Sequence, residues 1–154
     1  MKLARIGLTA AAILAVATVA WAQKPDFSGT WTLDPATAPA AGGGVVGGAL
    51  GNGPATVKQS ADRLTIERRM GDANITLIYK LDGTDSRNML MGPAGQQVDS
   101  MSNAKWDGSK LTIVTKMEMD GQLLQSTQVW TVAGNALTIE TSNARGTQKR
   151  VYKK

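Results

Sequence analysis

The chain has 154 residues, with 17 Lys and Arg against 12 Asp and Glu, and it contains neither histidine nor cysteine. The length suits one domain, or a leader plus one domain. Without cysteine there are no disulfides or thiolate metal sites, and without histidine the commonest general base and metal ligand are missing. An enzyme would have to use carboxylates, Tyr or Lys alone. We therefore expect a non-catalytic protein without metal or cofactor.

The first 22 residues have the pattern of a secretory signal peptide. Lys2 and Arg5 form a positive start, an uncharged Ala-rich run follows, and Ala20-Trp21-Ala22 supplies the small-x-small cleavage pattern. The run is too short and too weakly apolar for a stable membrane span. We expect residues 1–22 to be removed and residues 23–154 to form one exported domain, in the periplasm or outside the cell, with no transmembrane segment left.

The mature chain is predicted to begin with a short strand over 26–33, which places Trp31 and Leu33 on one face. Residues 35–54 then follow, rich in Gly, Ala and Pro and without periodicity. Such a composition predicts a flexible loop. A loop of this length inside a compact domain is uncommon and often serves as a lid or a binding loop.

From Ala55 onward, apolar and polar residues alternate, and turn residues such as Asp-Gly interrupt the pattern at short intervals. Three of the resulting segments contain Leu-Thr-Ile, with Leu and Ile on one face and Thr on the other. No segment has a helical repeat. The pattern predicts an antiparallel meander with strands over 55–59, 63–69, 74–80, 86–91, 97–105, 110–118, 122–131, 136–142 and 147–153.

A meander of about eight to ten strands without a covering helix has to protect its two edges. Closing the sheet into an up-and-down β-barrel removes both edges and turns alternate side chains inward. The short connections favour this all-β barrel. The alternatives are a two-layer β-sandwich and an open barrel.

Three short motifs, in order along the chain, resemble the calycins, the superfamily of lipocalins and fatty-acid-binding proteins. The first is the Gly-x-Trp of Gly29-Thr30-Trp31, and the second is the hairpin Trp106-Asp107-Gly108. The third is the Arg-x-Tyr of Arg150-Val151-Tyr152 in the last strand. With the strand count, these motifs cover most of the mature chain. The resemblance implies a lipocalin-like barrel that binds a small hydrophobic ligand.

The resemblance also implies where an anionic, fatty-acid-like ligand would be held. Arg150 and Tyr152 would recognise a carboxylate through a charged fork and a hydroxyl donor. A second basic residue of the family falls near Thr115, and the flexible thioether of Met117 suits either a pocket or an irregular core. In an alternative role, Arg150 lies across Trp31 and plugs the closed end, where a cation–π pair is worth about 0.5–2 kcal/mol.

A second function class also fits the sequence. The chain could be a structural or protein-interaction module of the cell envelope, with a filled interior and no ligand pocket. Its basic residues alternate across strands without interleaved aromatic residues, so no nucleic-acid partner is expected. We expect a monomer.

Overall fold

The structure is a computed structural model. It describes residues 24–38, 48–91 and 96–154, with only the backbone of Met91. The expected signal peptide, 1–22, lies outside these residues, and so does the middle of the 35–54 segment.

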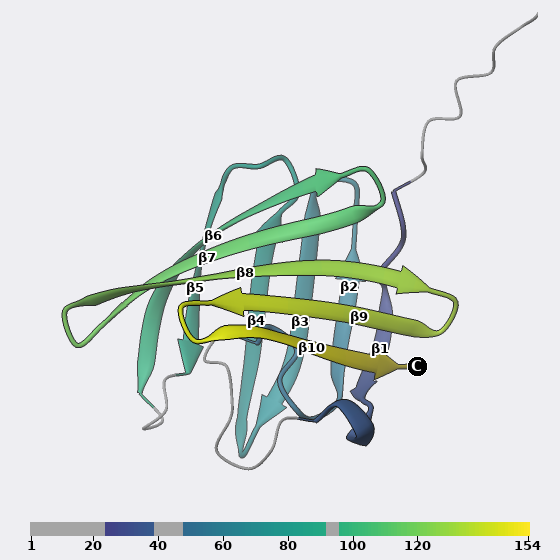
Figure 1. Cartoon of the computed structure of the whole chain (residues 1–154), viewed down its shortest axis with the longest axis horizontal. Helices are drawn as coiled ribbons and strands as arrows, with labels where there is room; N and C mark the ends of the chain where they lie inside the picture. Colours follow the sequence, from purple (N-terminus) through teal and green to yellow (C-terminus); the bar gives the residue numbers. More distant parts are fainter. Residues whose placement is uncertain (1–23, 39–47, 92–95) are drawn as a thin grey trace, which may run out of the picture.

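The described residues form ten antiparallel strands and one short 3-10 helix (Figure 1). Consecutive strands pair with each other, except β4 with β5, and β1 also pairs with β10, so the order is β4-β3-β2-β1-β10-β9-β8-β7-β6-β5. The predicted up-and-down meander, closed into a nearly complete barrel, is confirmed. The elements are β1 (Gly29–Leu33), η1 (Pro35–Thr37), β2 (Ala55–Gln59), β3 (Arg63–Met70), β4 (Ala73–Lys80), β5 (Asp85–Met91), β6 (Gln97–Asp107), β7 (Lys110–Met119), β8 (Gln122–Ala133), β9 (Ala136–Asn143) and β10 (Gly146–Lys153).

The alternation of side chains along the strands builds the core. The Leu and Ile of all three Leu-Thr-Ile segments are buried, as are Trp31 and Leu33 of β1. The first strand starts at Gly29 rather than at residue 26, because Asp26 accepts a hydrogen bond from the backbone N–H of Ser28 (2.8 Å). That bond turns the chain before the strand begins.

The segment that leads into β1 lies beside the end of the barrel where β6 and β8 finish (Figure 1). Aromatic rings pack together at this end. Phe27 stacks on Trp106 with ring centroids 5.7 Å apart, and it meets Trp130 edge-on. The indole Nε1 of Trp31 donates to the backbone carbonyl of Phe27 (2.8 Å). This end of the barrel is therefore closed by packed rings.

A seam remains between β4 and β5, where strand pairing is absent and side chains close the gap instead. Asn88 on β5 accepts from the backbone N–H of Ile78 (2.8 Å) and donates to its carbonyl (2.9 Å). Ser86 accepts from the backbone N–H of Lys80 (2.8 Å). Asn88 thus makes the two bonds that a paired strand residue would make.

Replacing Asn88 by alanine is expected to open this seam. The change removes both bonds to Ile78 and should lower the free energy of unfolding by about 2–3 kcal/mol. Urea unfolding measures the loss, with exposed Asn74→Ala on β4 as the matched control. Equal urea midpoints for the two variants would show that Asn88 does not stabilise the barrel.

Candidate functional site

Arg150 and Tyr152 both face the barrel interior from β10. They are two residues apart on one strand, and Tyr152 pairs in register with Leu33 of β1. Tyr152 is fully buried, and Arg150 is only 7 % exposed. The guanidinium of Arg150 donates to Asn52 Oδ1 and to Gln148 Oε1, each at 3.2 Å. The two residues that the resemblance implied are thus both inside.

The segment from Gly48 to Asn52 packs against these two side chains. Within it, Leu50 is only 1 % exposed and belongs to the hydrophobic core. The hydroxyl of Tyr152 donates to the carbonyl of Gly51 (2.9 Å). A Cβ atom at Gly48 would lie 3.2 Å from Arg150 Nη1, so the backbone approaches the guanidinium closely. This part of the predicted flexible loop therefore lies inside the barrel.

Arg68 on β3 is a second charged group at this place, and no motif in the sequence pointed to it. A side chain at Gly51 would collide with Arg68 Nη1, so the guanidinium lies against the same segment. Its Nε atom is buried without a hydrogen-bond partner. The alternation of inward and outward side chains along β3 predicts that Arg68 faces inward, because it has the same parity as the buried Leu64 and Ile66.

No carboxylate neutralises these two arginines. Of the three ion pairs among the described residues, none involves Arg68 or Arg150, and the segments outside the described residues contain no Asp or Glu. Burial lowers the pKa of Arg68. Burial raises the pKa of the Tyr152 hydroxyl, while the charges of Arg150 and Arg68 oppose that rise. The arrangement is a positive site, with Arg150 buried and Arg68 half-buried, flanked by a phenol, and it suits an oxyanion.

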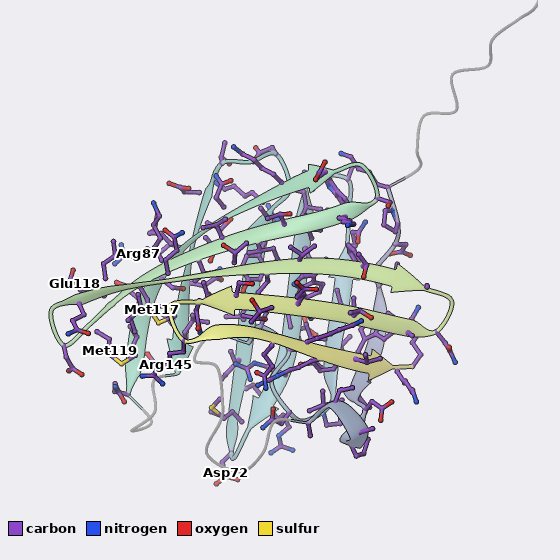
Figure 2. All side chains as sticks on the ribbon, in the orientation of Figure 1. Asp72, Arg87, Met117, Glu118, Met119 and Arg145 are labelled. Carbon is purple, nitrogen blue, oxygen red and sulfur yellow. The ribbon has the colours of Figure 1, made fainter. Side chains whose placement is uncertain are left out.

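Thr115 and Met117 face inward from β7, and both are buried. The hydroxyl of Thr115 lies 2.9 Å from that of Ser102 on β6. Figure 2 places Met117 and Met119 toward the β7–β8 turn. No hydrogen bond among the described residues joins Thr115 to Arg150 or Tyr152. Thr115 belongs instead to a row of buried polar side chains on β6 to β9: Ser100, Ser102, Thr115, Ser126, Gln128 and Thr141.

The cation over the Trp31 ring is Lys154, with its Nζ 4.8 Å from the ring centroid. The expected pairing of Trp31 with Arg150 is therefore corrected. The register explains the difference: Thr32 pairs with Lys153, which brings the chain terminus beside Trp31. Arg150 lies beyond the paired part of β1 and bonds to Asn52 instead.

Tyr79 on β4 lies near this charged group and leads to a prediction about alkaline pH. Burial raises the pKa of Tyr79, so its hydroxyl stays neutral in the folded state above pH 10, where an unfolded tyrosine ionises. The stabilisation is complete below about pH 10 and is lost as the pH rises further. In urea unfolding from pH 7 to 11, Tyr79→Phe should lose less stability above pH 10 than the wild type. Parallel pH profiles for the two proteins would contradict this prediction.

A search with the sequence finds no matching family model and no matching curated protein. Solved structures with the same architecture are found. Human cRBP IV is 20% identical, with a TM-score of 0.56, and the match covers 84% of this chain and 98% of that one. The fold is calycin-like. Secretory abundant heat soluble protein 4 from Ramazzottius varieornatus is also 20% identical, with a TM-score of 0.52, and the match covers 82% of this chain and 93% of that one.

The described part of the calycin-like barrel has neither a metal-binding cluster nor a membrane-spanning helix. Among the described residues, no group of three or more Asp and Glu side chains is placed to hold a metal ion. In the same part of the chain, no helix is long and apolar enough to cross a bilayer.

Proposed function

We propose that this barrel is a non-catalytic binding protein for a small ligand with an apolar body and an oxyanion group. Arg150 and Tyr152 would hold the oxyanion, with Arg68 beside them. The observation that carries the proposal is the buried guanidinium of Arg150 with the half-buried Arg68 beside it, neither of which has a carboxylate partner. A buried charge is costly unless it is paired, so an anionic ligand would supply the missing partner.

The interior wall supports an amphipathic ligand. The row of buried polar side chains on β6 to β9 offers hydroxyl and amide groups, and Ser126 Oγ is buried without a hydrogen-bond partner. Buried polar atoms are normally hydrogen-bonded. Thr115 in that row and Met117 beyond it would contact the body of the ligand.

We also propose that the protein is exported as a monomer. The support is the signal-peptide pattern of residues 1–22, which ends in Ala20-Trp21-Ala22. The absence of cysteine is compatible with export, because packing rather than disulfides stabilises this barrel.

A competition assay with two matched ligands tests the proposed function. The fluorescent probe 1-anilinonaphthalene-8-sulfonate is bound first and then displaced by dodecanoate or by dodecanol, which has the same chain without the charge. Dodecanoate should compete at least about tenfold better, because its carboxylate gains charge-assisted hydrogen bonds. If dodecanoate and dodecanol displaced the probe equally well, the oxyanion would have no part in recognition.

The alternative class, an envelope module without a pocket, is favoured by one observation. Ala49 and Leu50 are buried in the core, so part of the chain itself fills the interior. Failure of the folded protein to bind the probe, dodecanoate or dodecanol would support this alternative.

A further inference from the structure

The segment from Gly48 to Asn52, here named the inserted segment, behaves as an occupant of the barrel rather than as part of its wall. It contains no strand and no helix, yet Ala49 and Leu50 are almost completely buried. It reaches three side chains of the wall, on β3 and β10: Arg68, Arg150 and Tyr152.

The inserted segment makes the two kinds of contact that an amphipathic anion would make: acceptor oxygens on polar side chains and an apolar group in the core. Two oxygens, Gly51 O and Asn52 Oδ1, accept from Tyr152 and Arg150 at 2.9 and 3.2 Å. Next to these oxygens, the branched side chain of Leu50 lies in the hydrophobic core. An oxyanion attached to an apolar body presents the same two features.

The inserted segment neither neutralises the charge of the two arginines nor pairs all of their hydrogen-bond donors. Its oxygens belong to a neutral amide and a neutral carbonyl, whereas an ionised oxyanion would also attract the arginines by its charge and accept shorter, stronger hydrogen bonds. Arg68 Nε keeps a buried donor without a partner. Asn52 itself is exposed, so water can replace its bond to Arg150 when it leaves.

We infer that the ligand site of this barrel is the place that the inserted segment now fills, and that an organic oxyanion binds by displacing it. The ligand oxygens would replace Gly51 O and Asn52 Oδ1, its apolar body would replace Leu50, and Arg68 would gain the acceptor that it lacks. This inference rests on the proposed function and adds the location of the site, the role of Arg68 and the competition with the chain itself.

Thiol accessibility tests the displacement directly, because the chain has no cysteine. In Leu50→Cys the thiol should react slowly with a maleimide, and saturating dodecanoate should raise its rate at least tenfold. The control is Leu64→Cys, which is equally buried on β3 and should stay protected. If dodecanoate binds and the thiol at position 50 stays as protected as that at position 64, the inference is wrong.

Affinity provides a second test that does not disturb the core. Asn52→Ala removes the acceptor that now competes for Arg150, so it should bind dodecanoate about three- to tenfold more tightly than the wild type. The control is Asn135→Ala in the exposed β8–β9 turn, with unchanged affinity expected. Equal affinities of Asn52→Ala and the wild type would overturn the competition. Binding by Asn52→Ala alone would support it, and no binding by either protein would refute the proposed function as well.

Discussion

Arg150→Met is expected to stabilise the folded protein and to abolish its oxyanion binding. Arg150 is buried and has only the neutral oxygens of Asn52 and Gln148 as partners. Taking a guanidinium out of water without a counter-ion is costly, and an apolar side chain of similar length avoids that cost. The free energy of unfolding should therefore rise by about 1–3 kcal/mol.

The same substitution removes the charged donor from the site. Dodecanoate affinity should fall about tenfold to a hundredfold, the usual range for a lost hydrogen bond to a charged group. Urea unfolding and the competition assay measure the two effects. Stability and ligand affinity would then move in opposite directions, as expected where a residue is kept for function.

Arg145→Met is the matched control for this experiment. Arg145 lies in the exposed turn between β9 and β10 (Figure 2), so losing its charge should change neither stability nor binding beyond about 0.5 kcal/mol. A loss of more than 2 kcal/mol in Arg150→Met would instead assign Arg150 a structural role.

Trp31→Ala is expected to cause the largest loss of stability, about 3–5 kcal/mol. The ring is fully buried at the closed end of the barrel, and its Nε1 donates to the carbonyl of Phe27. Removing it leaves a large cavity under the aromatic cluster and an unpaired carbonyl. Thermal or urea unfolding monitored by circular dichroism measures this loss.

Two Trp→Phe variants separate the hydrogen bond from the ring. Trp31→Phe loses the bond to Phe27 and should cost about 1–3 kcal/mol. Trp106→Phe should cost less, because the Nε1 of Trp106 is buried without a hydrogen-bond partner. A larger loss at Trp106 than at Trp31 would show that ring packing alone stabilises the closed end.

The faces of the strands decide whether a methionine lies inside or outside the barrel. Met117 faces the interior and is buried, whereas Met89 is about half exposed on the outside of β5 (46 % of its surface). Met117 lies between Thr115 and Met119 on the same face of β7. Met89 and Met101 contribute to the outer surface instead.

Sequence alone determined the strands, the turns and the face of nearly every side chain. These features are local: alternation sets the face of a residue, and Asp-Gly pairs such as Asp120-Gly121, both with positive φ, set the turns. The resemblance pointed to Arg150 and Tyr152, which share the inner face of β10, and parity would have placed Arg68 on the inner face of β3. The closed meander followed from the number of strands and the lack of covering helices.

Only the tertiary structure decided which side chains and segments these inner residues contact. The register of β1 against β10 is a pairing between the two ends of the domain, and it brings Lys154 rather than Arg150 to Trp31. The position of Leu50 is equally non-local, because a Gly-rich stretch without periodicity carries no signal for its partners. Packing inside the closed barrel placed that stretch between Arg68 and Arg150 and so defined the candidate site.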